Sequence, residues 1–398
     1  MSDFGAELAR WMAARGVGVR ELHRRSGYSA GYITQLRQGR RFPSPDVARD
    51  LDDALGAGGA LAASREGRLP GQAVPEGLAR ADGDELAAVL TGHDAGGGEL
   101  PGTVAALAAS VDAARGDYQA CRYAHLGGIL PGLIRKLEAA CSAFVGADCE
   151  RSRALLADAY HVTAGVLLKH GDLGLAALAA DRSMRAALAS SNPVAVAGSA
   201  RIITHTLMSG GHLRTAVSAA AECAGALSRD VPRHTPGSLS VYGALLLRGA
   251  VAAAHDDNRG SAYELLGEAE EAAGRLGADA NHHWTAFGPL NARLHRVNIA
   301  VTLGDAGTAL DLARSIDPAA ITVTERRATL LIDTARACVQ RGRHEGAYLA
   351  LRAAHQAAPE EVAGRSAVLA LVRNLAATAP PTIRRDAAQF AAAIGAAR

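Results

Sequence analysis

The amino-acid sequence predicts an all-α protein: a small N-terminal helix-turn-helix domain followed by a long array of paired helices. Hydrophobic residues make up 49% of the 398 residues but aromatic residues only 4%, so the apolar mass is alanine, leucine and valine. Such a composition suits closely packed helices, and alternating runs typical of strands are hard to find. Short capped segments occupy the N-terminal region, and regularly spaced turn signals divide the rest.

Residues 3–26 predict two helices. In the segment 3–15 the apolar residues Phe4, Leu8 and Met12 recur at helical spacing, which indicates an amphipathic helix. The segment 19–26 is made largely of good helix formers. Gly27 follows it, where a residue without a Cβ can take the left-handed conformation that closes a helix.

Two more helices are expected between residues 29 and 55. Ser29 is a natural N-cap, Ile33 and Leu36 supply apolar contacts three residues apart, and Gly39 ends the run. Ser44 then caps a helix with Pro45 in its first position. The residues of this last helix that should face inward are Val47, Leu51 and Leu55.

Positive charge is concentrated around these helices. Between residues 15 and 41, seven arginines stand against the single acid Glu21: Arg15, Arg20, Arg24, Arg25, Arg37, Arg40 and Arg41. The whole chain has a formal net charge of only +2. A local field of this kind is what neutralising DNA phosphates requires, whereas a merely solvated basic face would not need the surrounding turn and caps.

The segment RELHRRSGYSAGYITQLRQGRRFPSPDVARDLDDAL resembles the repressor-type helix-turn-helix of the xenobiotic-response-element family. In that family the second helix of the motif enters the major groove. The resemblance implies base-facing positions at Ala30, Gly31 and Gln35, with Tyr32 and Thr34 beside them and Ser29 and Arg37 on the same helix. It implies phosphate contacts at Arg20, Gln38, Arg40 and Arg41. Because Ala30 and Gly31 are short, direct readout should rest on Gln35, which can form a bidentate pair with adenine.

One motif in this segment has a second interpretation. Residues 27–31 spell G-x-S-x-G, the pattern of a hydrolase nucleophile elbow, which requires a buried strand before the serine. The preceding residues, Glu21 to Ser26, are polar and predicted helical. Ser29 is therefore interpreted as a helix cap, and no catalytic residue is expected.

The domain boundaries follow from composition. Residues 1–62 form the helix-turn-helix domain, and residues 63–102 are rich in glycine and proline and read as a linker with one short helix near Asp84 to Leu90. Residues 103–398 form the helical array. In that array, turn signals recur roughly every 40 to 55 residues. They are Gly116-Asp117, Gly171-Asp172, Gly211-His212, Asp257-Asn258, Gly304-Asp305 and Gly342-Arg343.

An alanine follows five of these turns, where a second helix would pack closely: Ala176, Ala216, Ala262, Ala309 and Ala347. Three segments built this way resemble tetratricopeptide repeats, and the third has a closing proline at Pro359: LLADAYHVTAGVLLKHGDLGLAALAADRSMRAAL, NARLHRVNIAVTLGDAGTALDLARSI and ATLLIDTARACVQRGRHEGAYLALRAAHQAAP. Together with the helix-turn-helix, the chain resembles regulators in which such a solenoid senses a ligand, including receptors for short signalling peptides.

The resemblance also places a ligand site on the inner face of the solenoid. Counting back from each turn, the inner positions are His161, Lys169, Arg201, His205, Asn291, Asn298, Thr302, Arg336 and Gln340. Asparagine amides can pair with a peptide backbone, and the basic residues would favour a carboxylate or phosphate. Equally, polar residues on such a face can be simply solvated. The aromatic stretch 281–289 is expected either at the lip of this site or as a structured loop between repeats.

Other kinds of site find little support. His282 and His283 are adjacent, which disfavours shared metal coordination, and no H-E-x-x-H, Walker or dinucleotide motif occurs, so neither metal nor cofactor is expected. The five widely spread cysteines are interpreted as reduced packing residues. With no signal peptide or membrane span in the pattern, a cytoplasmic location is expected.

The sequence thus predicts a transcriptional regulator that binds an operator in double-stranded DNA as a homodimer and responds to a peptide or small molecule in its repeat domain. The alternative is an interaction scaffold, in which the solenoid holds a partner protein and the helix-turn-helix only tethers it to DNA.

Overall fold

The computed structural model describes residues 4–38, 43, 45–61, 80–92, 102–231 and 235–396, and within these ranges it contains helices and no strand. The chain forms two compact units, residues 1–74 and 75–398. The all-α fold class predicted from composition and helical spacing is confirmed.

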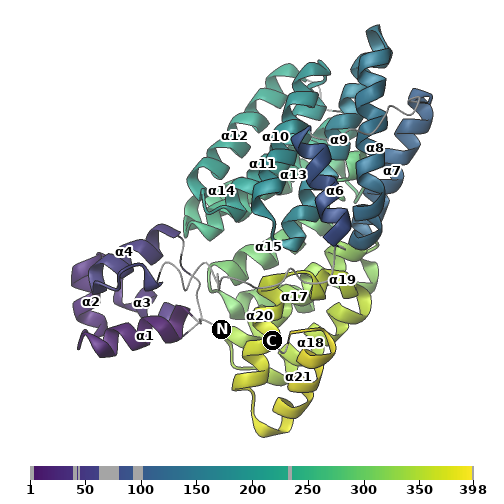
Figure 1. Cartoon of the computed structure of the whole chain (residues 1–398). Coiled ribbons are helices and arrows are strands. Elements are labelled where there is room, and N and C mark those ends of the chain that lie inside the picture. Colours follow the sequence, from purple (N-terminus) through teal and green to yellow (C-terminus); the bar gives the residue numbers. More distant parts are fainter. Residues whose placement is uncertain are drawn as a thin grey trace. The chain divides into compact units, whose positions relative to one another are not determined.

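The first unit contains the four short helices expected from the sequence (Figure 1). They are α1 (Phe4–Ala14), α2 (Val19–Ser26), α3 (Ala30–Arg37) and α4 (Pro45–Leu55). Their apolar faces meet in one core, in which Leu8, Leu22 and Ile33 are fully buried. Since each helix is too short to be stable alone in water, this shared core holds them together.

The predicted caps of α2 and α3 are confirmed. Gly27 has a φ of 77° and its N–H donates to the carbonyl of His23, so it closes α2 in the left-handed conformation. The Ser29 hydroxyl accepts from the backbone N–H of Tyr32 at 3.2 Å. The helix before Ser29 replaces the strand that a nucleophile elbow would need, so this serine is a cap. Gly39 and Ser44 lie outside the described residues.

The second unit is a sequence of packed helices. Its first half comprises α6 (Arg80–Thr91), α7 (Val104–Gln119), α8 (Tyr123–Ala143), α9 (Gly146–His170), α10 (Leu173–Ala189), α11 (Pro193–Ser209) and α12 (Leu213–Asp230). The second half comprises α13 (Pro236–His255), α14 (Arg259–Leu276), α15 (Pro289–Thr302), α16 (Ala306–Arg314), α17 (Thr324–Gln340), α18 (His344–Ala357), α19 (Pro359–Ala363), α20 (Ser366–Thr378) and α21 (Pro381–Ala393). Two single-turn helices lie at His282–Trp284 and Pro318–Ala320. Consecutive helices pack against one another, as in a solenoid.

Five of the six predicted turns separate helices as expected, and the alanine after each of them is fully buried. The prediction at Gly116-Asp117 is wrong, because both residues lie inside α7, which continues to Gln119. The turn comes later, at Cys121, whose φ of 61° reverses the chain without a glycine. Gly116 is instead a contact position: a Cβ there would lie 3.6 Å from the ring of Trp284.

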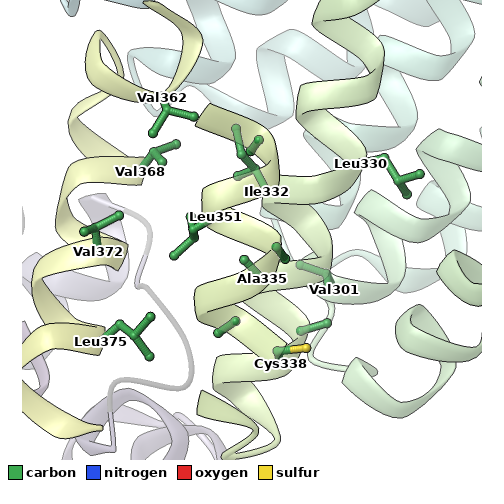
Figure 2. Close-up of a cluster of buried hydrophobic side chains, with 14 of the residues drawn as sticks. Val301, Leu330, Ile332, Ala335, Cys338, Leu351, Val362, Val368, Val372 and Leu375 are labelled. Atoms are coloured by element: carbon green, nitrogen blue, oxygen red, sulfur yellow. The ribbon is translucent and has the colours of Figure 1, made fainter. Parts of the chain in front are cut away.

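Helix α6 extends the short helix expected near Asp84 and packs on α8 and α10, with Leu86 and Leu90 fully buried against them. The second compact unit therefore includes part of the stretch that composition marked as linker. The C-terminal end of the unit has its own hydrophobic cluster, which α15, α17, α18 and α20 supply with residues that include Val301, Leu351 and Val372 (Figure 2).

Alternate helices form a continuous layer, which we call the inner layer. It consists of α7, α9, α11, α13, α15 and α17, each of which packs against the next, and α17 packs against α7. Polar contacts reinforce this closure, because the Tyr123 hydroxyl donates to Glu361 at 2.6 Å across 238 positions of sequence. The array therefore returns on itself, which its local repeat pattern does not predict.

Within the described residues, α13 is the one helix with the length and mean hydropathy of a membrane span, but 83% of its most apolar window is buried inside the unit. Its apolar surface is accounted for by neighbours α12, α14 and α15. All five cysteines carry free thiols, and Cys121, Cys149 and Cys338 are buried, which agrees with the packing role expected for them.

Candidate functional site

The surface of α3 presents the residues expected to meet DNA. Gly31, Gln35, Arg37 and Gln38 are exposed, whereas Ile33 and Leu36 on the opposite side are buried. Ala30, Tyr32 and Thr34 are partly buried. The Thr34 hydroxyl donates to the Ala30 carbonyl at 2.8 Å, so it is engaged within the helix. The amide of Gln35 is therefore the long polar group that α3 directs outward near its middle.

The arginines of the first unit divide by their contacts. Arg24 and Arg25 both pair with Glu21, and Arg15 donates to the Gly56 carbonyl at 2.8 Å while stacking on Trp11. Arg20 and Arg37 are exposed and make neither a hydrogen bond nor an ion pair within the described part of the chain. Their charge is available to phosphate groups. Arg40 and Arg41 lie outside the described residues.

In the second unit, five of the nine residues expected on the inner face take part in the α15–α17 contacts or in the closure of the array. The Asp333 carboxylate accepts from Asn298 and from Arg336, at 2.8 Å in each case. Arg336 also reaches the Thr302 hydroxyl at 3.4 Å, and Gln340 donates to the Val301 carbonyl at 3.0 Å. These bonds join α15 to α17. Lys169, the fifth, bonds to Glu325 and Glu361 in the closure of the array.

The other four expected residues are His161, Arg201, His205 and Asn291, and two of them keep polar atoms without a hydrogen-bond partner among the described residues. Arg201 donates to the Nε2 atom of His161 at 3.2 Å, but its buried Nε–H has no partner among the described residues. Asn291 is only 3% exposed, and within the described part of the chain neither atom of its side-chain amide is hydrogen-bonded. Since buried amides are ordinarily hydrogen-bonded, Asn291 is a candidate ligand-binding residue.

Four basic residues that the repeat pattern did not single out lie in the same layer: Arg115 of α7, Arg248 of α13, His295 of α15 and Arg326 of α17. Arg115 and His295 are buried, and Arg248 and Arg326 are partly exposed. One sequence signal could have found Arg248, because it is the one charged residue inside the apolar core of α13, where an unpaired charge is costly. The positions of Arg115, His295 and Arg326 depend on which face each helix turns towards the layer. Repeats as degenerate as these do not define that face from the sequence.

The histidines of this layer are held in the neutral form. Burial lowers the pKa of His161, His205 and His295, and neighbouring guanidinium groups lower each of them further. For His295 the lowering to about 3 reflects burial, then Arg326 and Arg248, opposed by its hydrogen bond to the Asn291 carbonyl and by Glu325. Each neutral imidazole can still donate one N–H.

The aromatic stretch proves to be a structured loop that ties α7 to the middle of the array. Gln119 donates to the carbonyl of Trp284 at 3.2 Å, and the Trp284 indole donates to Asp112 at 2.9 Å. Arg115 donates to the His283 carbonyl at 3.3 Å and pairs with Asp158 of α9. Left-handed backbone at His283, Trp284 and Ala286 lets this loop make the turn.

Acidification should destabilise the second unit before its carboxylates titrate. An unfolded histidine with a pKa near 6.5 binds a proton that folded His295 excludes, so the stability is fully present above about pH 6.5 and falls as the pH drops towards the folded pKa of about 3. His295 alone should cost about 2 kcal/mol at pH 5. Urea unfolding between pH 7.5 and 5 measures this. His295→Gln should reduce the slope and the exposed His282→Gln should leave it unchanged; equal slopes in both would contradict the assignment.

A family model described as a helix-turn-helix domain matches residues 3–64. This match spans α1 to α4 with the capped turn between α2 and α3, so the chain carries an N-terminal helix-turn-helix domain. No curated protein and no solved structure matched the chain.

Proposed function

We propose that this protein is a sequence-specific, DNA-binding transcriptional regulator of the xenobiotic-response-element type, acting in the cytoplasm, whose helical-repeat domain senses a peptide or small molecule. The observation that carries the proposal is the α2–α3 unit. Its core is buried and its turn is capped, α3 exposes the Gln35 side chain, and Arg20 and Arg37 are exposed cations with no partner among the described residues.

The helix-turn-helix supports a particular mode of binding. In such domains the second helix of the motif lies in the major groove and phosphate contacts fix its register. A single unit of this size reads only a few base pairs. We therefore infer that a homodimer binds a two-fold symmetric operator, which doubles the footprint.

The ligand-sensing role rests on the second unit. A tetratricopeptide-like array offers His161, Arg201, His205 and Asn291 at its inner layer, with donors left unpaired at two of them. A ligand that binds one conformation of the array better than another would shift the equilibrium between them, and operator affinity with it.

Replacing Gln35 by alanine should relax sequence preference at one operator position by about 1–3 kcal/mol, because a bidentate amide–adenine pair is lost. Selection of bound sequences from a random library, followed by affinity measurements on single-base variants, gives this number directly. Retention of the same preference would show that Gln35 does not read a base.

Arg40→Ala and Arg41→Ala are the matched comparison, because phosphate contacts carry no sequence information. These variants should weaken binding at all sequences and lower its salt dependence by about one unit of slope each. If random-library selection with the wild-type chain enriched no sequence at all, the proposal of a sequence-specific regulator would fail.

A further inference from the structure

Four arginines of the inner layer converge from four different helices: Arg115, Arg201, Arg248 and Arg326. Because α7, α9, α11, α13, α15 and α17 pack in sequence and α17 packs on α7, side chains on the enclosed side of these helices face a common interior. Two of the arginines contact the same helix, because Arg201 donates to His161 and Arg115 pairs with Asp158, both on α9. We call these four residues the arginine cluster.

The cluster lacks the carboxylates that would normally balance it. Arg115 pairs with Asp158 and Arg326 with Glu325, which is already shared with Lys169. Arg201 and Arg248 have no carboxylate partner among the described residues, and Arg248 has no hydrogen bond there either. Charged groups away from bulk water are ordinarily paired, since an unpaired one costs several kcal/mol.

The N–H donors of the arginine cluster suit the binding of an oxyanion. The Nε–H groups of Arg115 and Arg201 are both buried and have no acceptor in the part of the chain that the structure describes. A guanidinium presents its N–H groups in the planar fork that carboxylate and phosphate oxygens match. Burial first, and then the guanidinium groups of Arg248, Arg326 and Arg115, lower the pKa of Arg201 to about 9, so it stays charged at neutral pH while repelling its neighbours. A bound anion would offset the cost of burying the guanidinium group and would reduce the repulsion among the arginines.

We propose that the arginine cluster binds the oxyanion of a small molecule, a phosphate or a carboxylate group, and that this anion is the signal received by the repeat domain. The second clause rests on the proposed regulatory function; the anion site itself does not. His161 and His205, each partly buried, and the unpartnered amide of Asn291 supply further donors in the same layer. Closure of the array through Lys169 and Tyr123 favours a compact ligand over an extended polymer.

The test uses the full-length chain and three probes: inorganic phosphate, pyrophosphate and citrate, at constant ionic strength in a chloride buffer. Titration calorimetry measures affinity, and differential scanning calorimetry measures the shift in Tm. At least one probe should bind one-to-one and raise the Tm by mass action. Preference for phosphate or pyrophosphate over citrate identifies a phosphate ligand, and the reverse order a carboxylate ligand.

Arg201→Gln and Arg248→Gln should each weaken that binding about ten- to a hundredfold, because each loses charge-assisted hydrogen bonds. Arg248→Lys keeps the positive charge but loses the planar guanidinium, so its affinity for the anion should lie between those of the wild type and Arg248→Gln. Arg20→Gln and the exposed Arg214→Gln should bind as the wild type does, which excludes the DNA-binding surface and general charge. If one of the two variants Arg201→Gln and Arg248→Gln fails to fold, the other is sufficient for this test.

Absence of binding by all three probes, or unchanged binding in both glutamine variants, would overturn the anion site. Operator selection with the Arg248→Gln chain, without added anions, separates the two proposals. An anion site without any preferred operator would contradict the regulatory function alone, whereas operator binding without an anion site would contradict only the inference made here.

Discussion

Lys169→Ala is expected to lower the free energy of unfolding of the second unit by about 3–5 kcal/mol, because it leaves a buried carboxylate without its cation. The Lys169 ammonium lies 2.7 Å from Glu361 and 3.0 Å from Glu325, and the Glu361 side chain is completely buried. Burial alone would lower the pKa of Lys169, but the two carboxylates raise it above its ordinary value. Lys169 therefore stays charged and joins α9 to α17 and α19.

Urea unfolding followed by circular dichroism measures this loss. Lys136→Ala, which removes an exposed lysine, is the matched control and should change stability by less than about 1 kcal/mol. Adding Glu361→Gln to Lys169→Ala should recover part of the loss, since the completely buried carboxylate is then also gone. A change below about 1 kcal/mol in Lys169→Ala would mean that water or Arg365, 2.9 Å from Glu361, compensates the carboxylate.

Phe287→Ala should lower the free energy of unfolding of the second unit by about 3–5 kcal/mol, because buried apolar area is lost and a cavity forms. The Phe287 ring is fully buried and fills the space beside Gly243, where a Cβ would overlap it. The ring thus anchors the loop 281–287 to α13. Without this anchor, the contacts of Trp284 with α7 should loosen as well.

Fluorescence can follow this loop, because the chain has two tryptophans and Trp11 lies in the first unit. In a Trp11→Phe background, Trp284 should show a lower unfolding midpoint when Phe287 is alanine. Leu349→Ala, at a side chain 58% exposed, should leave the midpoint unchanged. Gly243→Ala should destabilise the wild type by about 1–3 kcal/mol but far less beside Phe287→Ala; additive losses would show that the two positions do not share the space.

Much of the first unit could be predicted from the sequence because its signals are local. Gly27 and Ser29 act on their own turns of helix through φ and a single hydrogen bond, and the apolar spacing of Phe4, Leu8 and Met12 fixes which face is buried. Five turns of the array and the small alanines after them were equally local. The same logic failed at Gly116, which lies inside α7 beside the ring of Trp284, a residue 168 positions away.

The candidate effector site could be predicted only in part. The repeat register predicts His161, Arg201, His205 and Asn291 at this site, but it also selects residues such as Asn298 that bond to the neighbouring helix. Arg115 and Arg326 were missed because their approach depends on α17 reaching α7, and no periodicity within either segment encodes that contact.

By itself, then, the sequence determined the helices, their caps and the outward face of α3, because each follows from neighbours within a few residues. Tertiary structure decided that the array closes on itself through Lys169, Tyr123 and Glu361. It also decided that four arginines, all positively charged, lie in the same inner layer. These features join segments up to 238 positions apart, and their energies come from burial and charge that exist only once the helices have packed.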